Sequence, residues 1–141
     1  MTGVHPWRRF RALAHFTLHW HTVGPRGVTD FEAQTVSLRR DLNQAGRRST
    51  IMHECLHIER GAVPMGLAAK EETRVRKLTA SLLLPDVHLV GDALIWGQGH
   101  VEPAAAELWV DLGVLKDRLR FCSPDEREYL MTRLREEAPT P

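Results

Sequence analysis

The chain has 141 residues, a length that suits one domain with a hydrophobic core of its own. Its hydrophobic content of 43% and charged content of 26% are ordinary globular values, and a formal net charge of +1 gives no sign of a strongly charged partner. No stretch reaches the ~18 apolar residues of a membrane helix, and the first residues lack the apolar run of a signal peptide. We therefore expect a single cytoplasmic domain over residues 1–141, without a membrane partner.

The first third of the chain predicts a short helix and a small sheet. Residues 7–14 suit a short helix, and apolar and polar residues alternate over residues 16–22, as in a half-buried strand. Residues 24–27, Gly-Pro-Arg-Gly, predict a turn. A shorter alternation over residues 35–40 predicts a second strand, and a polar connection then leads into the central helix.

The central helix is predicted around residues 48–60, which contain the motif His-Glu-x-x-His. Ser49 or Thr50 is a candidate N-cap, although the helix can begin as early as Asn43. Gly61 supplies a stop. The motif therefore lies on a helix in either case.

The two histidines of this motif lie four residues apart, so a helix places both imidazoles on one face, where they can bind one ion. Glu54 lies roughly 100° round the helix from His53, at the edge of that face. Zinc lowers the pKa of its bound water to about 7, and a carboxylate at this position can take the proton as the water attacks a carbonyl. His53 and His57 are thus candidate zinc ligands, and Glu54 is the candidate general base. The simpler alternative is a histidine pair without metal.

A second long helix is predicted from about residue 67 to 84, ended by Pro85. Its expected inward stripe consists of four residues with helical spacing: Val75, Leu78, Thr79 and Leu82. One turn earlier this stripe reaches Glu71 and Glu72, where a buried carboxylate is costly unless it is paired or bound to metal. Two His and one Glu, with water in the fourth position, form a zinc site. Helical phase does not separate the two glutamates, and a solvated first turn favoured by the helix dipole is the alternative for either.

The rest of the chain predicts mainly helices. Residues 87–95 suit a short helix or a strand, and residues 97–99, Gly-Gln-Gly, break the chain. Three further helices are expected over residues 103–109, 112–121 and 124–137. The central part of the predicted domain spans about residues 16–121, and residues 122–141 are expected to form a C-terminal helix and tail.

The run from Glu71 to Pro85, Glu-Glu-Thr-Arg-Val-Arg-Lys-Leu-Thr-Ala-Ser-Leu-Leu-Leu-Pro, together with the upstream motif, resembles the ImmA/IrrE family of zinc metallopeptidases. In that family the HExxH helix is followed by a helix of the form E-x-x-A-x-x-x-A-A-x-x-L-L-x-P. Residues 106–119 resemble the family's downstream helix pair, which is similar to a helix-turn-helix. The chain departs from the pattern at Val75, where Ala is usual, and at residues 78–79, where Phe-Ala or Ala-Ala is common.

The resemblance implies an α+β fold of minimal zincin-like type, in which a small twisted sheet packs on the HExxH helix beside a helical C-terminal part. It implies that His53 and His57 bind Zn²⁺ and that Glu54 is the general base. Alignment back from Leu-Leu-Leu-Pro makes Glu72 the third ligand, with Glu71 as second choice. It also implies an endopeptidase that cleaves a helix-turn-helix repressor and so relieves repression of phage, mobile-element or stress genes.

Two other functions stay open at this point. The first is a catalytically silent, zinc-stabilised regulator that binds a repressor protein or DNA, and the second is a general peptidase acting on unfolded chains. We do not expect direct nucleic-acid binding, because the basic and acidic residues of the segment that resembles a helix-turn-helix are balanced. These residues are Lys116, Arg118 and Arg120 against Asp111 and Asp117.

A peptidase also needs a group besides zinc that stabilises the developing oxyanion. Spacing does not place this group. His19 and His21 lie on one face of the strand predicted over residues 16–22. Two histidines placed in this way can bind metal, but here they are more simply explained as the polar face of the strand. The candidate stabilisers are His88, His100, His19, His21 and the single tyrosine, Tyr129.

Overall fold

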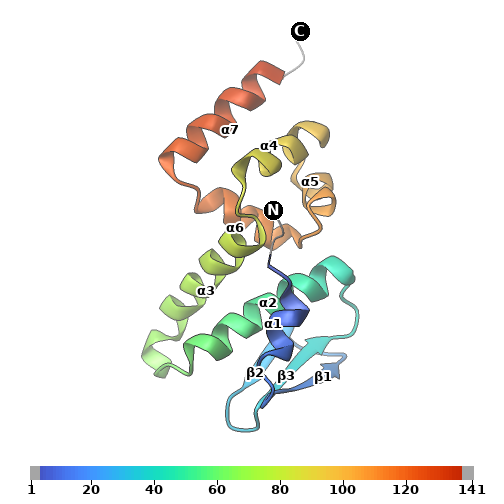
Figure 1. Cartoon of the computed structure of the whole chain (residues 1–141), viewed down its shortest axis with the longest axis vertical. Coiled ribbons are helices and arrows are strands. Elements are labelled where there is room, and N and C mark those ends of the chain that lie inside the picture. Colours follow the sequence, from blue (N-terminus) through green and yellow to red (C-terminus); the bar gives the residue numbers. More distant parts are fainter. Residues whose placement is uncertain (1–3, 138–141) are drawn as a thin grey trace.

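Seven α-helices, one short 3-10 helix and a three-stranded sheet make up residues 4–137, the part of the chain that the computed structural model describes (Figure 1). In chain order they are α1 (Pro6–Arg11), β1 (Thr17–His21), β2 (Gly27–Asp30), β3 (Thr35–Arg39), α2 (Gln44–Arg60), η1 (Met65–Leu67), α3 (Ala68–Leu83), α4 (Val87–Trp96), α5 (Val101–Glu107), α6 (Leu112–Arg120) and α7 (Pro124–Glu137). The expected α+β class is confirmed. The expected tail, residues 138–141, lies outside the described residues.

A membrane-spanning helix needs roughly 20 consecutive, predominantly apolar residues. Within residues 4–137 no single helix is long and apolar enough to cross a membrane. The segments Met65–Leu83 and Val87–Trp96 reach the required length and apolarity only when taken together, and the chain bends by 80° between them. Core helices of globular proteins pass the same test.

The sheet has the order β1-β3-β2, with β1 parallel and β2 antiparallel to the central strand β3. Val36 and Leu38 of β3 are fully buried, because β3 is covered by helix α2 and flanked by strands on both sides. Strand β2 was not predicted. It has only four residues with alternating exposure and directly follows the Gly-Pro-Arg-Gly turn, so its pattern is too short to stand out.

Strand β1 departs from the expected burial pattern. Trp20, which was expected to face the core, is 38% exposed. His21, expected on the polar face, is half-buried and bonds through its ring nitrogens to the Ser37 hydroxyl and the Pro25 carbonyl, both at 2.6 Å. The reason is that α2 packs against β2 and β3, so that the edge strand β1 has less helix against it.

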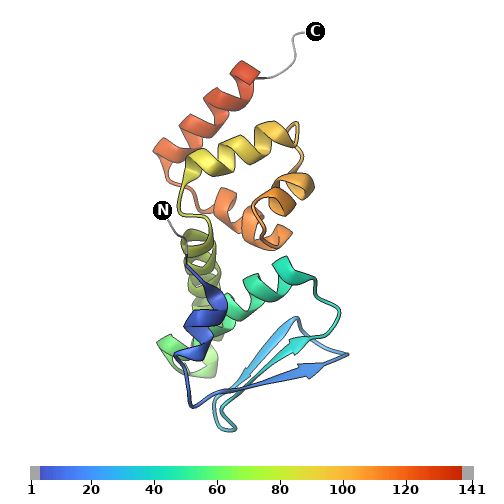
Figure 2. The ribbon, with the colours of Figure 1, turned by 45° about the vertical axis from the view of Figure 1, so that its right-hand side comes forward.

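Helix α2 packs into two hydrophobic clusters at once. Ile51 and Cys55 belong to a cluster with the sheet and α1, whereas Met52 and Leu56 belong to a larger cluster built by α3 to α7. Figure 2 shows the sheet on one side of α2 and the C-terminal helices on the other. The N-cap is Asn43, whose side chain accepts a hydrogen bond from the Gly46 amide at 2.7 Å. The other N-cap candidates, Ser49 and Thr50, instead lie buried inside the helix.

Helix α3 turns a slightly different face inward than expected. Val75 and Thr79 are buried as predicted, but Leu78 is 37% exposed and Leu83 is buried in its place. Helix α3 packs against both α2 and α6. Downstream, residues 87–96 form a helix and not a strand, with Asp86 as its N-cap.

Candidate metal centre

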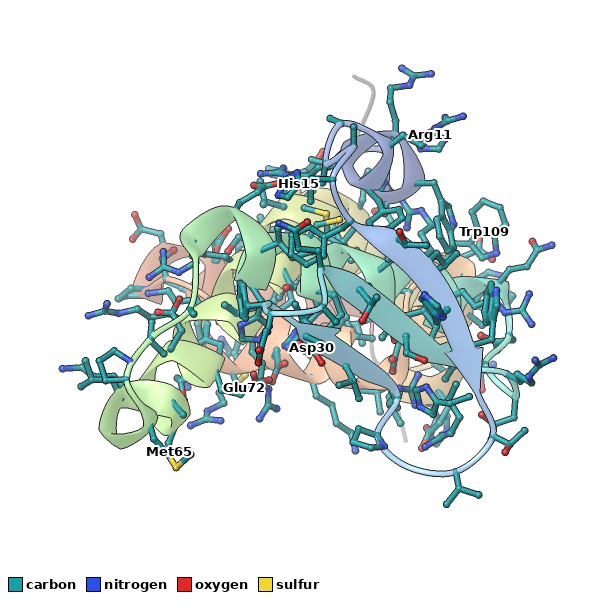
Figure 3. All side chains as sticks on the ribbon, turned by 90° about the horizontal axis from the view of Figure 1, so that it is seen from below. Arg11, His15, Asp30, Met65, Glu72 and Trp109 are labelled. Carbon is teal, nitrogen blue, oxygen red and sulfur yellow. The ribbon has the colours of Figure 1, made fainter. Side chains whose placement is uncertain are left out.

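Three side chains from two helices converge on one point. The Nε2 atom of His57 lies 3.2 Å from Nε2 of His53 and 2.9 Å from Oε2 of Glu72. The Nε2 atom of His53 lies 2.9 Å from Oε1 of the same carboxylate. Each residue offers one ligand atom, and these atoms lie within 4.8 Å of one another. In Figure 3 the labelled Glu72 lies nearer the middle of the view than the labelled Met65, which lies at its edge.

The local sequence explains this convergence. The four-residue spacing places the two imidazoles one helical turn apart on α2. Gly61, with a φ of +86°, ends α2, and η1 then leads the chain back so that the first turns of α3 face those imidazoles. The site is therefore made by two consecutive helices and the turn between them.

The two neighbouring glutamates of α3 have different partners. Glu71 is buried and accepts two hydrogen bonds from the Arg60 guanidinium, at 2.6 and 2.9 Å, whereas Glu72 faces the histidines. Adjacent helical positions are about 100° apart, so one carboxylate can meet the histidines while the other meets the end of α2. The structure thus brings together His53, His57 and Glu72, and it leaves Glu71 outside the group.

The electrostatics of the group favour a cation. Hydrogen bonds from both imidazoles hold the pKa of Glu72 far below its ordinary value. The hydrogen bond to Glu72, and to a lesser extent the nearby charge of Glu54, raises the pKa of His57 against the opposing effect of its burial. One cation bound between these groups would interact favourably with both imidazole nitrogens and with the ionised carboxylate at the same time. Two nitrogens and a carboxylate are also the donor set of many zinc sites, so these residues fit Zn²⁺.

Glu54 is held next to this group by strand β2. Its side chain is only 6% exposed, and its Oε2 atom accepts a hydrogen bond from the Thr29 hydroxyl. The backbone of β2 comes so close that a Cβ at Gly27 would lie 2.5 Å from the Thr50 methyl carbon and 3.0 Å from Oε1 of Glu54. Strand β2 therefore orients the carboxylate that the sequence proposes as general base.

A cavity of about 300 Å³ opens beside His53, Glu54 and Glu72. Its walls come from the start of β2, from α2 and α3, and from α6. Two ion pairs close it on the α6 side, Arg26 with Asp111 at 2.5 Å and Arg76 with Asp117 at 2.7 Å. These four residues were not predicted as parts of the site, because pairs separated by 85 and 41 residues leave no local pattern in the sequence.

The five candidate oxyanion stabilisers all lie elsewhere. None of them lines the cavity beside Glu54. His19 is exposed on β1, His21 bonds within the sheet, and His100 is exposed at the start of α5. His88 and Tyr129 pack together in the C-terminal helices, with ring centroids 4.6 Å apart. The arginines that do line the cavity are those of the two ion pairs.

Comparisons of the chain with models of protein families, with curated proteins and with solved structures found no match. The resemblance to the ImmA/IrrE family therefore rests on the sequence motifs alone, those of residues 53–57, 71–85 and 106–119.

Proposed function

We propose that this protein is a zinc-dependent endopeptidase of the ImmA/IrrE type with a minimal zincin-like fold. In this proposal His53, His57 and Glu72 hold Zn²⁺, and Glu54 is the general base. The observation that carries the proposal is the convergence of both HExxH imidazoles on a carboxylate of the next helix, with Glu54 buried at the same cavity.

The chain's own residues would divide the chemistry as follows. When bound, zinc would supply Lewis acidity toward water and toward the scissile carbonyl. Glu54 takes the proton of the attacking water and returns it to the leaving amine as the peptide bond breaks. The hydrogen bond from Thr29 occupies Oε2 of Glu54 and leaves Oε1 to exchange that proton.

The proposed substrate is a helix-turn-helix repressor in the cytoplasm, as the family resemblance implies, and no membrane takes part. A cavity of about 300 Å³ accepts a side chain or a short extended segment and not a folded domain. We therefore expect cleavage at an exposed loop or linker of the repressor. General degradation of unfolded chains would instead give many cuts.

The decisive experiment compares zinc-loaded protein with its Glu54→Gln variant, each incubated with a repressor-like protein encoded beside it. Intact mass should show one cut for the parent protein, and cleavage by the variant should be slower by about 10²–10⁴-fold, because general base catalysis is lost. Zinc content, measured on the same samples, should be equal. The matched control is Glu59→Gln, since Glu59 lies on the same helix but pairs with Arg9 outside the site.

A second candidate function is a zinc-stabilised regulator that binds a repressor without cutting it. One observation favours it: both arginines that line the cavity are engaged by aspartates. If parent protein and Glu54→Gln variant both hold zinc, both bind the repressor and neither cuts it, this second function replaces the first. Equal cutting by both proteins would remove Glu54 from the mechanism.

A further inference from the structure

A larger groove lies apart from the metal centre. It has a volume of about 1140 Å³ and is bounded by α1, the first turns of α2, strand β1 and Trp109, the second residue after α5. It shares no lining residue with the cavity beside Glu54. Figure 3 shows Trp109, at this groove, on the same side of the molecule as the labelled Arg11 of α1 and well away from Glu72.

The groove carries positive charge that the rest of the described chain does not neutralise. Four arginines line it, with no Asp or Glu among the lining residues, and only Arg9 has a carboxylate partner, Glu59. Within residues 4–137, Arg8, Arg47 and Arg48 form no ion pair. The last two donate only to backbone carbonyls, and Nε of Arg47 is buried without a hydrogen-bond partner in the described part of the chain. Such a surface is complementary to an anion.

The groove also presents flat aromatic faces. Three tryptophans line it, Trp7, Trp20 and Trp109. The side chains of Trp20 and Trp109 are 38% and 56% exposed. The guanidinium of Arg47 lies 4.9 Å from the Trp20 ring centroid. Cationic groups and indoles thus lie side by side in one groove, with the Arg48 guanidinium 6.0 Å from the Trp109 ring centroid.

The backbone holds Trp109 in a conformation that side chains rarely adopt. Its φ is +59°, at the end of α5, where the amides of Trp109 and Val110 bond back to Ala106 and Ala105. This helix ending ordinarily carries Gly, because a Cβ is strained there. Strained residues cluster at binding sites, and here the strained residue is a half-exposed indole at the groove.

We propose that this groove binds a segment of single-stranded nucleic acid, whose bases stack on Trp20 and Trp109 and whose phosphates pair with Arg8, Arg47 and Arg48. An acidic peptide or free phosphate would use the arginines but leave the indoles unused, and a duplex would keep its bases stacked internally. The proposal does not depend on the peptidase function. It also differs from the expectation based on sequence, because that expectation used the balance of charge within residues 106–119, of which only Trp109 lines this groove.

The test uses the intact protein and a fluorescein-labelled oligothymidylate of about ten nucleotides, followed by anisotropy across a salt series. Three phosphate contacts predict a slope of log affinity against log salt of about −2, since each single-strand contact contributes roughly −0.7. An abasic strand of equal length should bind roughly tenfold or more weakly, because it offers no base to stack. A duplex of the same length should also bind more weakly.

Two variants separate stacking from charge. Trp109→Gly removes the strained Cβ, so its thermal midpoint should not fall, yet its affinity for the oligonucleotide should drop roughly tenfold. Gln98→Gly is its control, because Gln98 has a φ of +55° at the equivalent end of α4 but lies outside the groove. Arg47→Gln should flatten the salt slope by about 0.7, whereas Arg127→Gln on α7 should not.

Three outcomes would overturn the proposal. One is the absence of oligothymidylate binding even at low salt. Another is equal affinity for the normal and the abasic strand, which would make the groove a phosphate site only. The third is equal or tighter binding of an oligoglutamate peptide together with no effect of Trp109→Gly, which would assign the groove to an acidic protein segment.

Discussion

At the scale of single residues, the two adjacent carboxylates at the start of α3 have different partners, and we expect them to have different roles. Glu72 meets both histidines, while Glu71 is buried against Arg60. We expect Glu72→Gln to weaken zinc binding by at least about tenfold, since losing even an outer partner of a ligand costs 10–100-fold. Glu71→Gln should keep zinc binding but lower the thermal midpoint of the metal-free protein, because the Arg60 charge loses its partner.

Zinc titration against a competing chelator and thermal unfolding without metal measure these two effects separately. A loss of zinc affinity in Glu71→Gln with none in Glu72→Gln would reverse the assignment. The pair is a matched test, because the substitutions are chemically identical and one position apart.

At the scale of elements, the close approach of β2 to α2 depends on Gly27. A Cβ there would meet Thr50 and Glu54, so Gly27→Ala should destabilise the fold by about 1–3 kcal/mol, the usual range for overpacking. It should also slow any cleavage by displacing Glu54. Gly113→Ala, on α6 at the same cavity, is the control, because its Cβ would have ordinary contacts only.

Urea unfolding of the two alanine variants gives the comparison. Gly113→Ala should be neutral or stabilising by up to about 1 kcal/mol, as for Gly→Ala inside a helix. A Gly27→Ala variant as stable as the parent protein would show that β2 can move away from α2 without loss, and would contradict its role in orienting Glu54.

At the scale of the whole molecule, Arg118 joins the C-terminal helices. It is buried on α6, donates to the Leu84 carbonyl at 2.6 Å, and binds both carboxylate oxygens of Glu126 at 2.9 and 2.6 Å. These hydrogen bonds lower the pKa of Glu126 from 4.5 to about 2. Below pH 4.5 Glu126 binds a proton in the unfolded chain but not in the folded chain. The contribution of this ion pair to the free energy of unfolding is therefore complete above pH 4.5 and is lost as the pH falls toward 2.

The free energy of unfolding, measured from about pH 5 down to 2, should therefore fall less steeply in Glu126→Gln than in the parent protein. Glu128→Gln serves as the control, since Glu128 is exposed on the same helix. Parallel curves for the parent protein and Glu126→Gln would contradict a role of this pair in acid stability.

Short-range patterns predicted the parts of the molecule that short-range contacts build. Helical spacing placed His53 and His57 on one face, and the next helix brought Glu72 within reach, because the group spans only 20 residues. Helical phase did not choose between the two glutamates, since that choice depends on where the Arg60 side chain lies. Strand β2 escaped prediction because its four-residue pattern is too short, and the ion pairs to α6 escaped it because their partners are distant in sequence.

The position of α2 between two hydrophobic clusters has a thermodynamic consequence. His53 and His57 lie on the stretch of α2 whose other residues enter both clusters, and Glu72 lies on α3, so a bound ion would be held by a helix that both clusters fix in place. A bound ion would then stabilise the whole molecule by RT ln(1 + [M]/Kd), about 2.7 kcal/mol at one hundred times Kd. A chelator would remove that contribution from the molecule as a whole.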